Sequence, residues 1–278
     1  MSAGRGSRRA DGGAVRHPAR AAAALLLAIT TSVVACGCTL TTSGTAAAPP
    51  PVTATPATSP PTTVATNADG WEAVGTSVQG RPIRARTLGQ GPRKVLFIGG
   101  IHGDETEGAY STAELPAAFT AAGLADAVTL TILEDANPDG RAAGTRDNAN
   151  GVDINRTFPA KNFDTSNGGE PLSQPESRVV FDLINRIGPD LVVVAHSWTG
   201  RQFVNFDGPA RPIAERFAAS TGLPVEESSS FASTPGSLGS YFGRDRGFSI
   251  LTIELLKGSD PQADWEKIRE SLLQAIAG

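Results

Sequence analysis

The sequence from Trp71 to Gly278 predicts an α/β domain, in which helices pack on a β-sheet. Short apolar runs alternate there with longer stretches of helix-forming residues, and no internal repeat is visible. The chain has 278 residues, 40% of them hydrophobic, which is enough to bury a substantial core. We therefore expect one folded domain over residues 70–278.

The predicted elements follow in chain order. Residues 94–100 (Lys-Val-Leu-Phe-Ile-Gly-Gly) predict a buried strand closed by a tight loop, and residues 107–122 predict the helix that follows. Further buried strands are predicted over 127–133, 191–195 and 248–255, and amphipathic helices over 176–187 and 262–277. In domains of this class, binding sites form where strands end.

The first 36 residues have the layout of a bacterial export signal. Residues 1–20 carry five arginines against one aspartate, and the small apolar run over 21–35 ends in Val33-Val34-Ala35-Cys36. This run is shorter than the roughly 20 residues of a permanent membrane helix. Its end resembles a lipobox, which implies lipidation of Cys36 and anchoring to the outer face of the cytoplasmic membrane. Ordinary secretion is the alternative.

A tether is predicted between this signal and the domain. Residues 37–69 are rich in Thr, Ala, Ser and Pro, and residues 39–66 carry no charge. Such a segment cannot bury enough apolar surface to offset the entropy cost of ordering it. We expect a disordered, extended linker that holds the domain away from a membrane.

Charge and cysteine usage exclude several classes of function. The net charge is −4, and removal of residues 1–36 takes away five Arg and one Asp, which brings it near −8. Because no basic run lies beyond residue 20, a nucleic-acid partner is not expected. The only cysteines are Cys36 and Cys38, so the domain has neither a disulfide framework nor a cysteine-rich metal site. Any metal ion has to be held by His, Asp or Glu.

Two histidines of the domain, His102 and His196, each follow a predicted buried strand. In the turn from His102 to Glu105, an imidazole and a carboxylate stand three residues apart and can converge on one ion. With His196 the set becomes His, Glu, His, which suits a catalytic zinc that keeps one position open for water. A histidine at a strand end is nevertheless more often a hydrogen-bonded residue than a ligand.

Further motifs decide between these readings. The segments that stand out are His102 to Glu105, Asn137-Pro138-Asp139-Gly140, the block from Arg146 to Arg156, Ala195-His196-Ser197-Trp198, and Thr252-Ile253-Glu254-Leu255. In this order and spacing they resemble the zinc metallocarboxypeptidases of peptidase family M14, over about residues 94–256. The resemblance implies a three-layer αβα fold with a mixed β-sheet and helices on both faces.

The resemblance also implies a catalytic machinery. One zinc ion would be held by His102, Glu105 and His196. Glu254 would act as general base and then general acid, taking a proton from zinc-bound water and passing it to the leaving amine. Arg146 would stabilise the oxyanion of the tetrahedral intermediate.

Three more residues of the arginine block receive roles from the resemblance. Asn155 and Arg156 would bind the terminal carboxylate of the substrate, for which a planar guanidinium is well shaped. Asp153 would orient His102 by accepting its second ring N–H. Arginines are usually solvated surface charges, whereas a glutamate inside an apolar strand, as at position 254, is unusual.

Two features depart from the digestive members of the family. Between the first two ligands, those members have a basic residue where this chain has Asp104. They also carry a mobile tyrosine upstream of the catalytic glutamate, for which this chain offers only Phe231 or Tyr241, so the role of that tyrosine stays unassigned. The His-Gly-Asp-Glu turn and the glycine-rich segment 236–243 look more like the murein peptide amidase branch. That branch cuts the bond between γ-D-glutamate and meso-diaminopimelate in cell-wall peptides.

We therefore expect a lipid-anchored zinc amidase that acts on muropeptides. Arg244 and Arg246 would pair with the extra carboxylate of diaminopimelate. The alternatives are a less selective carboxypeptidase, an aspartoacylase-like deacylase of N-acyl amino acids, and a catalytically silent wall-binding lipoprotein. Protein partners cannot be named from the sequence.

Overall fold

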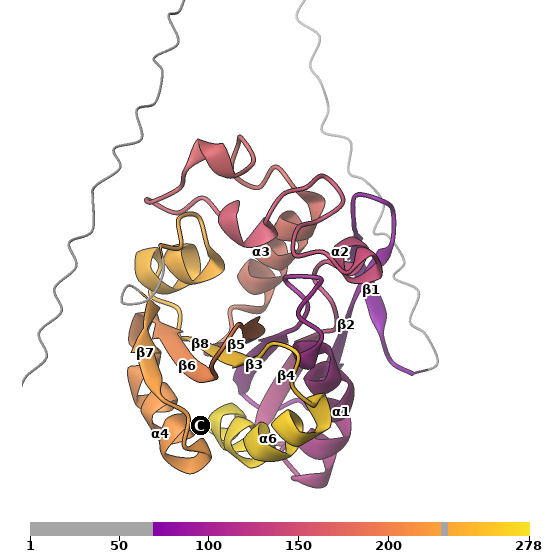
Figure 1. The fold of residues 1–278 in the computed structure, drawn as a ribbon. Helices are drawn as coiled ribbons and strands as arrows, with labels where there is room; N and C mark the ends of the chain where they lie inside the picture. Colours follow the sequence, from indigo (N-terminus) through magenta and orange to yellow (C-terminus); the bar gives the residue numbers. More distant parts are fainter. Residues whose placement is uncertain (1–68, 229–232) are drawn as a thin grey trace, which may run out of the picture. The chain divides into compact units, whose positions relative to one another are not determined.

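The computed structural model describes residues 69–228 and 233–278 of the chain (Figure 1). The predicted export signal with Cys36, the tether up to residue 68, and Phe231 lie outside the described residues. Among the helices that the structure describes, none has both the length and the apolar character needed to cross a bilayer.

Eight strands form one sheet in the order β1-β2-β4-β3-β5-β8-β6-β7. Their bounds are Glu72–Thr76 for β1, Pro82–Leu88 for β2, Arg93–Ile98 for β3, Val128–Leu133 for β4, Leu191–Trp198 for β5, Phe203–Asp207 for β6, Val225–Glu227 for β7 and Ile250–Leu256 for β8. The run β4-β3-β5-β8 is parallel, whereas β1 with β2, β2 with β4, and β6 with β8 pair antiparallel. The predicted mixed sheet is confirmed.

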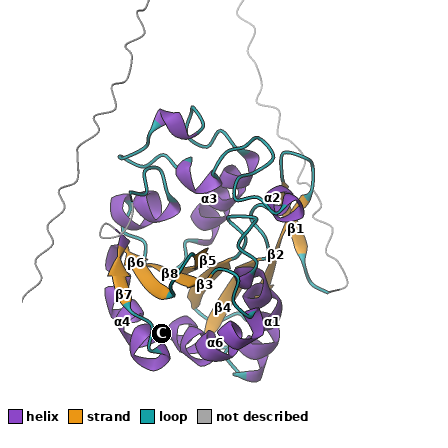
Figure 2. Ribbon diagram, viewed as in Figure 1, coloured by secondary structure: helices purple, strands orange, loops and turns teal. Residues whose placement is uncertain are grey.

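Helices cover both faces of this sheet (Figure 2). Helices α1 (Glu107–Ala121), α4 (Arg211–Thr221) and α6 (Pro261–Ala277) contribute to one core, and α3 (Pro175–Ile187) contributes to the other. Shorter segments are α2 Pro138–Ala143, η1 Ile154–Arg156, η2 Thr165–Asn167, η3 Gly208–Ala210 and the π-helical turn η4 Gly239–Asp245. The arrangement has the three layers that the resemblance implied.

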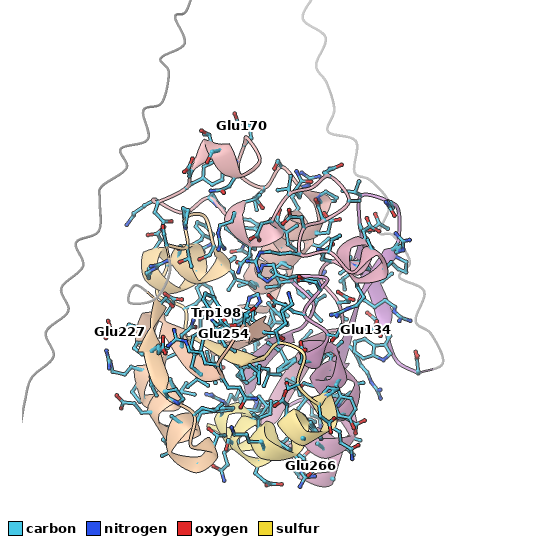
Figure 3. The ribbon with its side chains drawn as sticks, in the orientation of Figure 1. Glu134, Glu170, Trp198, Glu227, Glu254 and Glu266 are labelled. Atoms are coloured by element: carbon cyan, nitrogen blue, oxygen red, sulfur yellow. The ribbon has the colours of Figure 1, made fainter. Side chains whose placement is uncertain are left out.

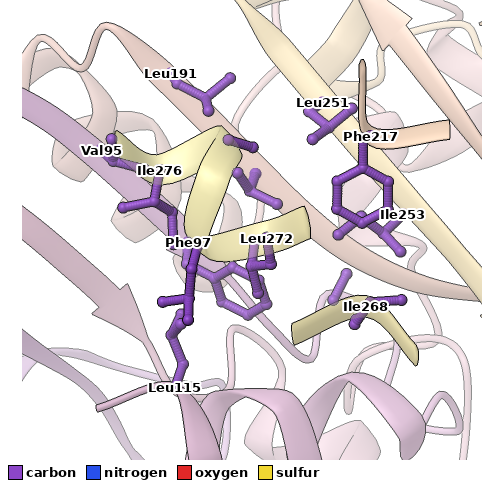
Figure 4. Close-up of a cluster of buried hydrophobic side chains, with 14 of the residues drawn as sticks. Val95, Phe97, Leu115, Leu191, Phe217, Leu251, Ile253, Ile268, Leu272 and Ile276 are labelled. Atoms are coloured by element: carbon purple, nitrogen blue, oxygen red, sulfur yellow. The ribbon is translucent and has the colours of Figure 1, made fainter. Parts of the chain in front are cut away.

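Strand β3 shows why the central strands carry long apolar runs. Its side chains alternate between the two faces, so Val95 and Phe97 enter the core under α1, α4 and α6, whereas Leu96 and Ile98 enter the core under α3. Figure 4 shows the first core, where Phe97 lies close to Leu272 of α6. The side chains at positions 95–98 are completely buried, as is typical of a strand covered on both faces.

The predicted strands and helices are all present, with one difference that matters for the site. The strand predicted over 191–195 continues to Trp198, because β8 pairs with it along its whole length. His196 therefore lies inside β5, opposite Glu254, instead of following the strand. His102 lies beyond the end of β3, in a turn. Strands β1, β2, β6 and β7 and helices α2 and α4 were not predicted.

Candidate active site

Two imidazoles and a carboxylate meet at the carboxyl ends of β3 and β5. The Nδ1 atom of His102 lies 2.8 Å from Oε1 of Glu105, and Nδ1 of His196 lies 2.8 Å from Oε2 of the same carboxylate. Ligand atoms of the three residues lie within 4.8 Å of one another, and all three residues are buried. The structure thus brings together the three predicted ligands.

The protonation pattern of this group suits a metal ion. The second ring nitrogen of His102, Nε2, lies 3.2 Å from Oδ1 of Asp153. A carboxylate accepts a hydrogen bond from a protonated nitrogen, which leaves Nδ1 of His102 with its electron pair directed to Glu105. Two imidazole nitrogens and a carboxylate are ligands that zinc accepts. The residues therefore fit the ion that the sequence suggested.

Backbone and side-chain contacts hold Glu105 in place. The backbone N–H of Ser197 donates to Oε2 of Glu105 over 3.1 Å, and Arg141 donates to the carbonyl oxygen of Glu105 over 3.1 Å. Ser197 is itself bound, because its hydroxyl donates to the buried carboxylate of Glu107 over 2.5 Å. Gly103 lets the turn approach α2, since a Cβ atom there would lie 1.9 Å from the backbone of Gly140.

Arg146 stands at the edge of the same group. Its Nη2 lies 3.0 Å from Oδ2 of Asp153, and its Nη1 lies 3.3 Å from Oε1 of Glu105. The side chain is 43% exposed, so the guanidinium faces the pocket and solvent. Burial by itself would raise the pKa of Asp153, but the hydrogen bond with His102 and the charge of Arg146 outweigh it and hold that pKa below its usual range.

Asn155 and Arg156 line the pocket from the turn η1. Asp153 caps this turn by accepting from the backbone N–H of Asn155 over 2.9 Å. The amide oxygen of Asn155 accepts from the backbone N–H of Leu238, and its amide nitrogen lies 3.4 Å from Nε2 of His196. Arg156 donates to the carbonyl oxygen of Asn155 over 2.9 Å. One cap thus positions both predicted substrate-binding residues.

Glu254 reaches this pocket from β8, beside His196 on β5. The residue is only 6% exposed, and Oε2 has no hydrogen-bond partner among the described residues. Figure 3 shows Glu254 and Trp198 in the middle of the domain. Burial raises the pKa of Glu254 to about 7, and the negative charge of Glu105 adds to the effect. A carboxyl with such a pKa can both take and give a proton near neutral pH.

The pocket has polar residues that the sequence patterns missed. Asn205 and Asp207 of β6 line it, and so do Ser228 and Thr234 beyond that strand. Both β6 residues are buried, at 6% and 7% exposure. A signal was present in Phe-Val-Asn-Phe-Asp, where Asn205 and Asp207 alternate with apolar residues. The strand is too short for this alternation to separate it from a loop.

The two arginines predicted to bind diaminopimelate lie differently. Arg246 does not line the pocket: it donates to Asn185 of α3, and its guanidinium lies over the rings of Tyr241 and Phe248. Arg244, by contrast, reaches pocket residues, as described below. Tyr241 stacks on Phe181 and is absent from the described pocket lining, so it cannot supply the mobile tyrosine in this conformation. In this structure the cation of Arg246 packs against aromatic rings outside the described pocket lining, so the geometry gives its predicted role no support.

Asp104, the other departure from the digestive members, is engaged in an ion pair. Its Oδ2 lies 2.5 Å from Nζ of Lys257, directly after β8. This pair joins the turn that carries His102 and Glu105 to the end of the strand that carries Glu254.

Comparison with known proteins agrees with a metal site formed by two histidines and a glutamate. The sequence profile described as zinc carboxypeptidase matches residues 70–229. Murein peptide amidase A of Escherichia coli is 31% identical over 228 residues, which cover 75% of this chain and 88% of that protein. The homologous amidase of Vibrio campbellii is 29% identical over 179 residues, covering 58% of this chain and 68% of that protein.

Solved structures show the same fold. The crystal structure of murein-tripeptide amidase MpaA from Escherichia coli aligns with a TM-score of 0.59 and 26% identity, covering 75% of this chain and 92% of that chain. Bovine thrombin-activatable fibrinolysis inhibitor aligns with a TM-score of 0.62 over 74% of this chain and 87% of that chain, at 18% identity. The second likeness concerns the fold alone.

Proposed function

Because the chain belongs to the zinc carboxypeptidase family and is a hydrolytic enzyme, we propose that it cleaves the amide bond between γ-D-glutamate and diaminopimelate in cell-wall peptides. One observation carries the proposal: Glu254, a buried carboxylate with one oxygen that has no hydrogen-bond partner among the described residues, stands beside a His–Glu–His group in one pocket. The likeness to murein peptide amidases supports a cell-wall peptide as the substrate class.

His102, Glu105 and His196 would hold one zinc ion. When bound, zinc would supply Lewis acidity, which lowers the pKa of water and polarises a carbonyl group. Asp153 keeps the ring of His102 in the orientation that this requires.

Glu254 performs the proton transfers. Its pKa of about 7 lets it take a proton from the attacking water and then give that proton to the leaving amine of diaminopimelate. The oxyanion that forms on the scissile carbon needs a cation beside it, and Arg146 is the exposed cation at the edge of the His–Glu–His group.

Asn155 and Arg156 orient the substrate. Both line the pocket, and the guanidinium of Arg156 is mostly buried, so it binds a carboxylate with little competition from water. The α-carboxylate of the leaving residue is the group that they would hold.

We further propose that the enzyme works outside the cytoplasmic membrane. The charge pattern of residues 1–20, the apolar run and Cys36 support export and lipid anchoring. Replacing Cys36 with Ser should move the protein from the membrane fraction to the soluble fraction. Undiminished membrane association would count against the anchor.

Product analysis tests the proposed reaction. The zinc-loaded protein is incubated with L-Ala-γ-D-Glu-meso-diaminopimelate and with ordinary L-peptides, and the products are identified by mass spectrometry. Release of free diaminopimelate, abolished by a chelator, is the expected result. C-terminal trimming of ordinary peptides would instead indicate a general carboxypeptidase. No product from either would favour the deacylase or the silent binding protein.

A further inference from the structure

The pocket extends along the sheet beyond Glu254. Residues two apart on a strand share a face, so Thr252 lies beside Glu254 on β8, and Asn205 and Asp207 lie on the corresponding face of β6. In the β6–β8 register, Glu254 pairs with Phe203, and Asp207 is four residues further along β6. At about 3.4 Å per residue, Asp207 lies about 14 Å from the level of Glu254. That span accommodates an extended side chain of a bound residue.

Asp207 is a buried carboxylate against which two glycines pack closely. Its Oδ2 accepts from the hydroxyl of Ser228 over 2.9 Å. A Cβ atom at Gly239 would lie 2.1 Å from Oδ2 of Asp207, and one at Gly243 would lie 2.3 Å from its Cβ. The glycine-rich segment that the sequence drew attention to is therefore shaped around this carboxylate. Burial of a carboxylate costs free energy of folding, so its presence here favours a functional role for Asp207.

Arg244 provides the opposite charge at the same end of the pocket. Its Nε lies 3.4 Å from Oδ1 of Asp207, and its Nη2 donates to Thr234 over 2.9 Å. The side chain is 35% exposed, and its partners Asp207 and Thr234 line the pocket, whereas its Nη2 also contacts Ser240. At 3.4 Å the pair with Asp207 is loose, and both partners can engage a ligand.

Asn205 supplies an independent sign that something binds here. Its amide oxygen is buried and has no hydrogen-bond partner among the described residues. The residue is 6% exposed and lines the pocket between Glu254 and Asp207. Buried polar atoms in native proteins are nearly always paired, so this oxygen is available to accept a hydrogen bond from a ligand.

We infer that Asp207, Arg244 and Asn205 recognise an amino group and a carboxylate carried on one carbon atom at the end of the substrate side chain. Asp207 and the oxygen of Asn205 would accept from the ammonium group, and Arg244 would bind the carboxylate. The inference rests on the proposed function and deepens it, because diaminopimelate carries both groups at its distal end. Lysine carries only the ammonium group and leaves Arg244 without a ligand.

Two substrates that differ only in the distal carboxylate test this inference. These are L-Ala-γ-D-Glu-meso-diaminopimelate and L-Ala-γ-D-Glu-L-Lys, and kcat/KM is measured for both. The unaltered protein should prefer the first by about 10- to 100-fold, the loss that accompanies one charge-assisted contact. Arg244→Gln should lower kcat/KM for the diaminopimelate peptide by a similar factor, mainly through KM. It should affect the lysine peptide much less, so the preference falls.

Two further variants separate the roles. Asp207→Asn should lower kcat/KM for both peptides, because both carry the ammonium group. Arg246→Gln is the matched control, since this neighbouring arginine packs on aromatic rings away from the pocket, and it should leave the preference intact. Thermal unfolding and zinc content establish that each variant is folded and loaded. An Arg244→Gln protein that keeps the preference, or that loses both substrates equally, would overturn the inference.

A binding measurement distinguishes failure of the inference from failure of the proposed function. Calorimetry compares free meso-diaminopimelate with free L-lysine on the zinc-loaded protein and on Arg244→Gln. Arg244-dependent preference for diaminopimelate without any cleavage would retain the inference and reject the amidase reaction. Cleavage of the diaminopimelate peptide with no Arg244-dependent preference in either assay would do the reverse.

Discussion

Two hollows of the described domain differ in character. A groove of about 1140 Å³ runs between α1 and β2 and is lined by Trp71, Pro116 and several arginines. The pocket at the ends of β5 and β8 is less spacious, but it contains the His–Glu–His group and one oxygen each of Glu254 and Asn205 without a partner in the described part of the chain. The more spacious hollow is therefore not the one that holds the candidate metal ligands.

The charges of the two hollows explain the difference. In the groove, Arg84 is paired with Glu134 at 2.8 Å, and Arg141 is paired with Asp135 at 3.0 Å. Figure 3 shows Glu134 on the β2 side of the domain, well away from Glu254. The carboxylate of Glu254 is instead buried, and no residue that the structure describes forms a hydrogen bond with its Oε2. One buried nitrogen of Arg141 in the groove also lacks a partner among the described residues, so an unpaired atom alone does not mark a functional site. A raised-pKa carboxyl beside a His–Glu–His group marks it better than either an unpaired atom or volume.

The largest contrast concerns catalysis. Glu254→Gln should lower kcat by at least about 10³-fold, because it removes the group that transfers the proton. Zinc content should stay unchanged, as measured by atomic absorption. Glu134→Gln in the groove is the matched control and should keep full activity. Equal activity of the two variants would refute the proposed mechanism.

Glu254→Gln, which should lower activity, should raise the stability of the folded protein. A carboxyl whose folded pKa lies above its unfolded pKa loses stability as the pH rises between the two values. For Glu254 that window runs from the ordinary value of 4.5 to about 7. In zinc-free protein, Glu254→Gln should therefore raise the free energy of unfolding at pH 8 by about 3 kcal/mol, with little difference at pH 4. Chemical denaturation at both pH values measures this, and a variant less stable at pH 8 would contradict it.

A smaller effect is expected at the partner of His102. Asp153→Asn should weaken zinc binding by about 10- to 100-fold, because the ring loses the carboxylate that fixes its orientation. Competition with a chromophoric chelator measures the zinc Kd. Glu134→Gln again serves as the control and should bind zinc like the unaltered protein. An unchanged Kd for Asp153→Asn would mean that the contact does not position the ligand.

The smallest effect is expected in the groove. Arg84→Ala removes the ion pair with Glu134, whose side chains are 36% and 33% exposed. Pairs this exposed contribute less than about 1 kcal/mol, so the unfolding temperature should change little and activity should stay the same. A large loss of activity would show that the groove takes part in substrate binding.

The sequence motifs located the His–Glu–His group, because His102 and Glu105 are neighbours along the chain and the central strands are apolar. The polar end of the pocket was not found in the same way. Asn205 and Asp207 face Thr252 and Ile250 only through the pairing of β6 with β8, which joins segments far apart in sequence. Arg244 and Arg246 look alike in the sequence, yet only the packing of aromatic rings around Arg246 separates them.

The pairing of His196 with Glu254 across β5 and β8 has a consequence for insertions and deletions. Neighbouring residues of a strand point to opposite faces, so the loss of one residue within β8 before position 254 would move its carboxylate into the core under α4 and α6. A substitution changes one side chain, whereas slippage between these two strands would redirect every side chain of β8 at once.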